Sequence, residues 1–215
     1  NLSASQVDRQ AECKMSYFLK YGLRAKENEQ YEINAADTGT YAHEIIRRMC
    51  EKIDTDPSLD WKSVSKSQCE NIVNEIVSDT LSNIESSDLR DKEFTADILT
   101  RMGKTVASAA HTAVRSIACG SFRTAAYEKE VYIPIGKDIE VGGIIDRLDV
   151  CEHDGINEYR IIDYKTGNKL FKVADIYHGI DMQPVIYALA MRMLDPKAKI
   201  SGMYYSLMHN DCPTI

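Results

Sequence analysis

The hydrophobic pattern of the sequence changes its period near residue 122, and this change constrains the fold more than any other feature. Before it, apolar residues recur every three or four positions, as they do on the buried face of an α-helix. The clearest series is Ile98, Met102, Val106, Ala109, Ala113 and Ile117. After Phe122, apolar residues alternate with charged ones, which is typical of β-strands. The pattern therefore predicts an α/β protein with a helical N-terminal half and a mixed β-sheet flanked by helices.

Cap and turn residues set the expected boundaries of these elements. Ser3, followed by Gln6 three positions later, forms a capping box that should open a first helix reaching Gly22. Gly120 should end the last of the N-terminal helices. The expected helices are 3–22, 37–53, 64–84, 91–119 and 181–194, and the expected strands are 126–135, 139–151, 159–164 and 200–208. The helix 181–194 is apolar almost all round and should be buried.

Length and composition are those of an ordinary globular chain. With 215 residues, of which 44% are hydrophobic and 27% charged, we expect a single domain with a mainly helical part at 1–120 and a sheet-containing part at 121–215. The longest apolar run, Val185–Met191, is too short to span a membrane. The chain begins with Asn1 and has no basic-then-apolar leader, so we expect no signal peptide and a piece excised from a longer protein.

The net charge of −7 and the six cysteines narrow the range of partners. An acidic chain is a poor nonspecific binder of polyanions, so action on nucleic acid would require a metal ion or a basic surface from a larger parent. The cysteines at 13, 50, 69, 119, 151 and 212 include no CxxC pair, so no self-contained zinc site is expected. We expect reduced thiols, several of them buried.

Two aspartates and a lysine are expected to meet at one end of the sheet. Asp163 and Lys165 are two positions apart in one strand and share a face, and Asp146 lies in the neighbouring strand of the predicted hairpin. Carboxylate oxygens suit Mg²⁺ or Mn²⁺, and the backbone carbonyl of Tyr164 could be a further ligand. The alternative is a cross-strand salt bridge between Lys165 and one of the two carboxylates.

Three further polar side chains occupy positions that suit either function or packing. His43 falls at the edge of the apolar stripe of its helix, where it could line a cleft or make a half-buried polar contact. Gln183 and Tyr187 are spaced i, i+4 and so lie on one face of their helix. A buried glutamine needs hydrogen-bond partners, so a satisfied core amide is the alternative interpretation of Gln183.

Taken in order, these residues resemble a known family. The motifs are Gly39-x-x-x-His43, Gly143-x-x-Asp146-Arg147-x-Asp149, Asp163-x-Lys165-Thr166-Gly167 and Gln183-x-x-x-Tyr187. Together they resemble the PD-(D/E)XK nuclease superfamily in its RecB-like branch. The segments Leu2–Ser5 and Cys13–Leu23 are similar to the start of the C-terminal nuclease domain of AddB-type helicase–nuclease subunits.

The resemblance implies a restriction-endonuclease-like fold and a Mg²⁺- or Mn²⁺-dependent exodeoxyribonuclease. In that family the histidine, the hairpin aspartate and the first aspartate of D-x-K bind the metal, and the matching residues here are His43, Asp146 and Asp163. The lysine, here Lys165, orients or activates the attacking water. The glutamine and tyrosine, here Gln183 and Tyr187, support the lysine and the DNA backbone.

Two more acidic residues near the motifs need a separate interpretation. Asp149 is offset by three positions from Asp146, so a regular strand turns it to the opposite face. We therefore expect a structural role for Asp149, with Arg147 as its candidate partner. Glu130, in the preceding strand, is left open between a structural and a functional role.

The resemblance also bears on cofactors and partners. AddB-type domains join their ends through an iron–sulfur cluster held by one cysteine before the nuclease core and three after it. Cys13 matches the first, but only Cys212 lies near the C-terminus, so we expect no cluster here and a 4Fe–4S cluster only in a full-length parent. Implied partners are DNA, single-stranded as it leaves a motor, and helicase domains or a partner subunit, in cytoplasmic double-strand break repair and recombination. The alternatives are a stand-alone or phage RecB-like exonuclease, and an inactive nuclease-like module that binds DNA or partner subunits.

Overall fold

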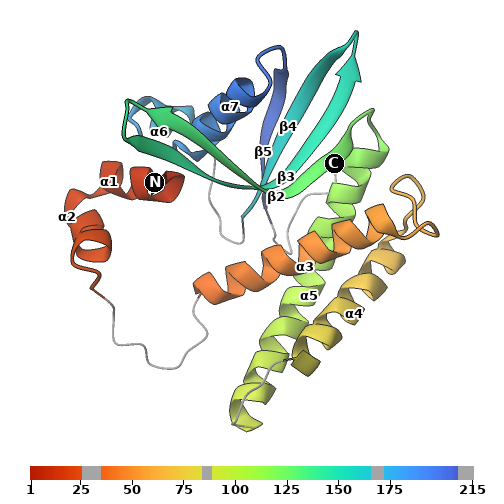
Figure 1. Ribbon diagram of the computed structural model, residues 1–215. Coiled ribbons are helices and arrows are strands. Elements are labelled where there is room, and N and C mark those ends of the chain that lie inside the picture. The colour runs from red at the N-terminus through yellow and green to blue at the C-terminus, as the bar shows by residue number, and fades with distance from the viewer. Residues whose placement is uncertain (26–34, 84–88, 166–171, 208–215) are drawn as a thin grey trace. The chain divides into compact units, whose positions relative to one another are not determined.

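The computed structural model describes residues 1–25, 35–83, 89–165 and 172–207, which cluster into two compact units (Figure 1). The sheet unit comprises Asn1–Glu32, Arg123–Asp163 and Leu170–Tyr205. The helical unit comprises Ile33–Phe122, Tyr164–Lys169 and Ser206–Ile215. Within the described stretches, no helix is long and apolar enough to cross a membrane.

The sheet unit is organised around one long strand, β3, in a five-stranded mixed sheet. The strands are β1 (Leu2–Ser3), β2 (Arg123–Ile135), β3 (Ile139–His153), β4 (Ile156–Lys165) and β5 (Lys199–Leu207). β2 and β4 pair with β3 in antiparallel register, β1 pairs in parallel with the beginning of β3, and β5 follows β4. The four long strands lie where alternation predicts them, and the mixed sheet with helices packed on it confirms the predicted fold class.

The first helix, α1 (Ala4–Glu12), opens with the predicted capping box. Ser3 Oγ accepts the N–H of Gln6 at 3.2 Å, and Gln6 Oε1 accepts the N–H of Ser3 at 2.7 Å. The prediction of one helix as far as Gly22 is wrong, because the backbone is extended at Cys13, before α2 (Lys14–Tyr17) and a π-helical turn (Phe18–Gly22). Cys13 Sγ accepts the N–H of Ser16 at 3.5 Å and so caps α2, which stabilises the break.

The helix α7 (Gln183–Leu194), which follows the short α6 (Val173–Tyr177), packs against β2 and β3. Its contacts build the core of the sheet unit, whose buried members are Ala4, Val131, Ile133, Val141, Ile145, Leu148, Ile161, Ile186, Tyr187, Ala190 and Met191. The prediction that α7 is buried all round is wrong, because the face that carries Leu189, Met193 and Leu194 is at least 50% exposed at each residue.

The helical unit consists of α3 (Ala35–Thr55), α4 (Lys66–Asn83) and α5 (Leu89–Ala118), which pack pairwise. Their apolar stripes meet as the helical period predicts. On α5 the buried members are Met102, Val106, Ala109, Ala113 and Ile117, while Ile98 is partly buried. α3 begins at Ala35, two residues before the start that the sequence suggests, and the remaining boundaries agree to within about two residues.

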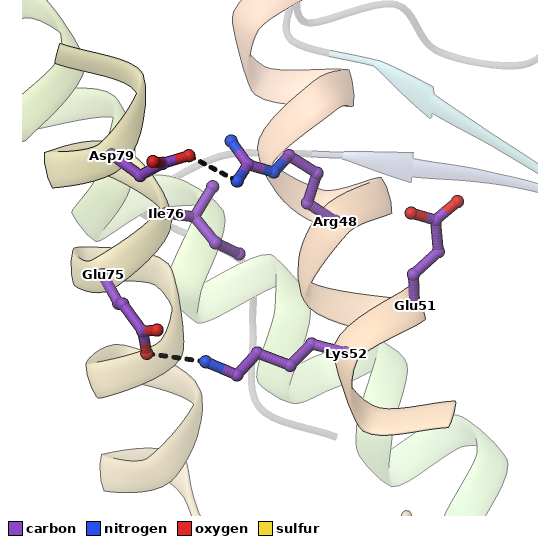
Figure 2. A pocket seen from close by; sticks show the side chains of 6 residues that line it. All are labelled: Arg48, Glu51, Lys52, Glu75, Ile76 and Asp79. Atoms are coloured by element: carbon purple, nitrogen blue, oxygen red, sulfur yellow. Dashed lines mark hydrogen bonds and ion pairs between the residues drawn. The ribbon is translucent and has the colours of Figure 1, made fainter. Parts of the chain in front are cut away.

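Two ion pairs join α3 to α4 at the surface of this unit. Arg48 Nη2 lies 2.6 Å from Asp79 Oδ2, and Lys52 Nζ lies 2.6 Å from Glu75 Oε2 (Figure 2). With Glu51 and Ile76 these residues line a charged pocket between the two helices. Surface pairs of this kind contribute about 0–1 kcal/mol each, so burial of the apolar stripes is the main source of stability here.

Candidate functional site

The two aspartates expected to bind a metal lie opposite each other on β3 and β4. Arg147 pairs with Ile162 in the antiparallel register, so the next position along it sets Asp146 opposite Asp163. Side chains at opposite positions share a face, with Cβ atoms roughly 4.5–5.5 Å apart. Both aspartates are buried, with exposures of 8% and 5%. Neighbouring buried carboxylates repel each other, so this arrangement favours a bound cation.

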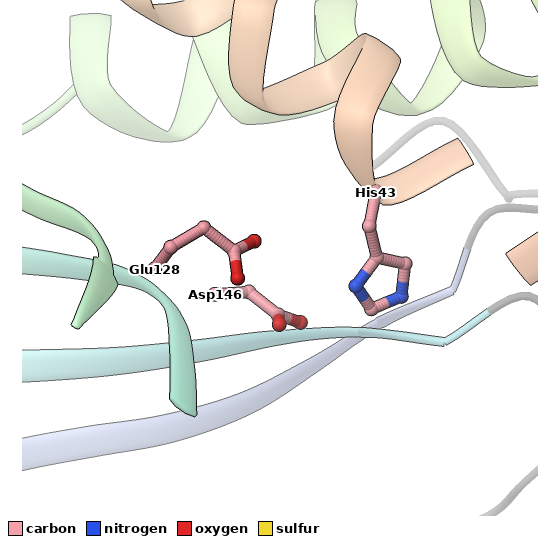
Figure 3. A group of neighbouring side chains, drawn as sticks. All are labelled: His43, Glu128 and Asp146. Carbon is pink, nitrogen blue, oxygen red and sulfur yellow. The ribbon is translucent and has the colours of Figure 1, made fainter. Parts of the chain in front are cut away.

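A third carboxylate, that of Glu128 on β2, lies on the other side of Asp146. The pairs on either side of it in the β2–β3 register set Glu128 opposite Asp146. Oxygen atoms of the two side chains come within 4.8 Å of each other, and Figure 3 shows the two carboxylates turned toward one another. The sequence pattern drew attention to Glu130 and not to Glu128. Glu128 has a left-handed backbone (φ 46°), so simple alternation along β2 does not predict its direction, whereas the register across the strands does.

The same face of the sheet receives Tyr187 and Gln183 from α7. Tyr187 donates its phenol O–H to the carbonyl oxygen of Ile144 at 2.7 Å, and its oxygen accepts the Nε2–H of Gln183 at 3.1 Å. The predicted pairing of these i, i+4 side chains is therefore confirmed. Burial, aided by the charges of Asp163 and Asp146, raises the pKa of Tyr187 to about 12. The phenol is thus neutral at physiological pH and fixed against the strand that carries Asp146.

Gly143 of β3 has a packing role that its place in the Gly143-x-x-Asp146 motif does not reveal. A Cβ atom added at Gly143 would lie 2.8 Å from the Tyr187 phenol oxygen and 3.2 Å from its Cε1 atom. Real Cβ atoms do not approach other atoms so closely. The missing side chain of Gly143 therefore admits the Tyr187 ring to the edge of the carboxylate row, which consists of Glu128, Asp146 and Asp163.

His43, Tyr164 and Lys165 belong to the helical unit. His43, which Figure 3 also labels, lies on α3 and is half-buried, as its position at the edge of the apolar stripe predicts. Its ring meets the buried ring of Tyr164 edge to face, with centroids 6.2 Å apart and planes at 80°. Tyr164 directly follows Asp163 in β4, and Lys165, half-buried, ends that strand.

Asp149 has the structural role that strand alternation predicts. It is fully buried, and its Oδ1 atom lies 3.0 Å from Arg147 Nε. Arg160 Nη2, from β4, lies 3.2 Å from the other oxygen, Oδ2. A buried carboxylate between two guanidinium groups is compensated within the fold, so Asp149 has no need of a metal.

The cysteines that the structure describes are free thiols in differing surroundings. Cys50 and Cys69 are buried in the helical unit, and burial raises the pKa of Cys69 to about 11. Cys13 and Cys119 are exposed, and Cys151 is partly buried. Cys212, Thr166 and Gly167 lie outside the described residues.

The donor set on the sheet fits a hard divalent cation. Glu128, Asp146 and Asp163 offer only oxygen atoms, which Mg²⁺ and Mn²⁺ prefer over nitrogen or sulfur. A soft cation would call for thiolate ligands, and both buried cysteines lie in the other unit. The chemistry that the row supports is therefore that of a metal ion acting on an anionic or oxygen-rich substrate.

A family model and a group of curated proteins match this chain. The model described as the PD-(D/E)XK nuclease superfamily matches residues 1–213. An ATP-dependent helicase/deoxyribonuclease subunit of the AddB type from Clostridium acetobutylicum is 31% identical over 201 residues, which cover 88% of this chain and 17% of that protein. The protein of the same name from Clostridium perfringens (strain SM101) is 34% identical over 203 residues, with coverage of 89% and 17%. A Thermoanaerobacter relative is 29% identical, with coverage of 95% and 19%. The chain thus spans less than a fifth of the length of these relatives.

Proposed function

Because the chain belongs to the PD-(D/E)XK nuclease superfamily, we propose that it is a divalent-metal-dependent nuclease domain that hydrolyses phosphodiester bonds of DNA. The observation that carries the proposal is the row of Glu128, Asp146 and Asp163 across three adjacent strands. Both units would belong to this one domain.

The metal would be held by Asp146 and Asp163, with Glu128 as an added ligand and with His43 and the Tyr164 carbonyl completing the set. The contact between the rings of His43 and Tyr164 supports this choice, since Tyr164 is bonded directly to Asp163. A bound Mg²⁺ or Mn²⁺ supplies a water of lowered pKa and polarises the phosphoryl oxygen.

Three side chains would act around that centre. Lys165, two residues after Asp163, would hold the attacking water and offset negative charge on the phosphoryl group. Tyr187 is neutral and oriented by its bond to Ile144, so it can hold Gln183 in place. Gln183 would in turn support the lysine and the DNA backbone.

The wider role follows from the relatives and is also a proposal. Proteins named as helicase/deoxyribonuclease subunits match this chain over less than a fifth of their length. We infer that the chain is the nuclease part of such a protein, acts as an exonuclease on single-stranded DNA delivered by a motor, and serves double-strand break repair in the cytoplasm. A 4Fe–4S cluster that includes Cys13 would belong to the longer parent.

The test is cleavage of end-labelled single- and double-stranded DNA by the 215-residue chain, with Mg²⁺, with Mn²⁺ and with a chelator. Asp163→Asn should abolish cleavage and leave the circular dichroism spectrum unchanged, because it removes a metal ligand and keeps the shape of the side chain. Asp138→Asn, on the exposed β2–β3 turn, is the matched control and should cleave like the wild type. A folded wild-type chain that binds DNA without cutting it would favour the inactive binding module instead.

A further inference from the structure

The beginning of α7 is held by acidic side chains from distant parts of the sheet unit. Asp8 of α1 accepts the backbone N–H of Met182 through Oδ1 at 2.7 Å. Met182 is the N-cap residue of α7, and its thioether is too weak an acceptor to cap a helix. Asp8 therefore supplies the cap across 174 residues of sequence.

A second contact fixes the residue before Met182. Asp181 is only 2% exposed, and its Oδ1 atom accepts the phenol O–H of Tyr205 in β5 at 2.7 Å. Its backbone has φ 60°, in the left-handed region that residues other than glycine adopt at a cost in energy. A strained backbone persists where the surrounding contacts determine it, and strained residues gather at functional sites.

These contacts lie within one helical turn of the residues placed in the site. Gln183 is the first residue of α7, and Tyr187 follows one turn later. The ring of Tyr205 lines the same small cavity as Asp163, Gln183 and Tyr187. Because a helix moves as a rigid element, holding its first turn also sets where Tyr187 meets the carbonyl of Ile144.

The hydrogen bond from Tyr205 persists over the whole physiological pH range. Burial, the bond to Asp181 and the nearby charges of Asp163 and Asp8 all raise the pKa of Tyr205 far above its ordinary value. The phenol therefore keeps its proton and remains a donor to Asp181. The charge of Asp163 is felt at Tyr205, which supports the proximity of this contact to the carboxylate row.

We propose that Asp8 is a positioning residue of the nuclease site: with the Asp181–Tyr205 pair it holds the start of α7, and so sets Gln183 and Tyr187 against Asp146 and Asp163. The inference rests on the proposed function and extends it to the N-terminal helix. α1 would then be a working part of the site and not only a cover for the sheet.

Three variants separate the hydrogen bond from the charge of Asp8. Asp8→Ala removes the acceptor and should lower the single-turnover cleavage rate about tenfold at saturating Mn²⁺, since small displacements of positioned groups cost large factors in rate. Asp8→Asn keeps an acceptor oxygen and should stay within about twofold of the wild type. Glu12→Ala removes an exposed charge from the same helix and should leave the rate unchanged.

A double-mutant cycle distinguishes positioning from a general loss of stability. If Asp8 acts through α7, Asp8→Ala should slow cleavage in the wild type but not in the Gln183→Ala background, while its effect on thermal stability should be the same in both. An equal loss of rate in both backgrounds would overturn the proposal.

Amide hydrogen exchange keeps this test apart from that of the proposed function. A wild-type chain that does not cleave DNA would refute the proposed function alone. The contact itself predicts that Asp8→Ala speeds exchange at Met182 and that Glu12→Ala does not. Unchanged exchange at Met182 in Asp8→Ala would refute the role of Asp8 whether or not the chain cleaves DNA.

Discussion

Substituting Gly143 by alanine tests the packing that brings Tyr187 to the carboxylate row. The added Cβ would lie 2.8 Å from the phenol oxygen and 3.2 Å from Cε1. The ring is 3% exposed and has little room to withdraw. Overpacking in a core costs about 1–3 kcal/mol, and loss of the hydrogen bond to Ile144 adds about 1 kcal/mol. We therefore expect Gly143→Ala to lower the free energy of unfolding by about 2–4 kcal/mol.

The Tyr187→Phe background isolates the cause. Removing the phenol oxygen eliminates the shortest contact, so the alanine should cost about 1 kcal/mol or less there, and the two substitutions should couple by about 1–3 kcal/mol. The assay is urea unfolding followed by far-ultraviolet circular dichroism. Gly120→Ala is the matched control, because its Cβ would meet nothing closer than 3.8 Å. Strictly additive costs for Gly143→Ala and Tyr187→Phe would refute the reasoning.

Three further predictions concern the site. Lys165→Ala should abolish cleavage and keep Mn²⁺ affinity, because an ammonium group does not ligate a cation; calorimetry that shows lost affinity in a folded variant would contradict this. His43→Ala should weaken Mn²⁺ binding more than it lowers stability, and the reverse result would make His43 a packing residue. Because the pKa of Tyr187 is raised to about 12 in the folded chain, its contribution to stability is complete below pH 10 and is lost as pH rises toward 12. Tyr187→Phe should therefore lose less stability than the wild type across this alkaline range, whereas equal losses would argue against a buried phenol.

The elements of the fold were predictable because each one carries its own period. The stripe on α5 and the alternation along β3 depend only on local spacing. Strand alternation likewise assigned Asp149 to a structural role, which its ion pairs with Arg147 and Arg160 confirm. The all-buried α7 failed, because an apolar sequence does not say how much of a helix its neighbours can cover.

The site was less predictable, because part of it depends on contacts between distant segments. Glu128 reaches the row through the β2–β3 register, which shifts at a bulge between Thr124 and Ala126. Asp8 caps a helix that begins 174 residues later, and no local motif encodes such a contact. The break at Cys13 was missed for a similar reason, since a side-chain cap from sulfur is not part of the usual helix-start signals.

The carboxylate row also predicts how an acidic chain can act on a polyanion. A chain of net charge −7 has few cations to spare for DNA phosphates, and the row adds three negative charges at the point of attack. A divalent ion bound there reverses the local field, so DNA affinity should depend on metal more than on extended phosphate contacts. For single strands, the slope of log K against log salt is about −0.7 for each phosphate contact, so two or three contacts predict a slope of about −2. Fluorescence anisotropy of labelled single-stranded DNA with Asp163→Asn should show weak binding, and the wild type with Ca²⁺ in place of Mg²⁺ should bind more tightly with this shallow slope. A slope of about −5 or steeper, unaffected by the metal, would mean that a basic surface binds the DNA and that the row has no part in it.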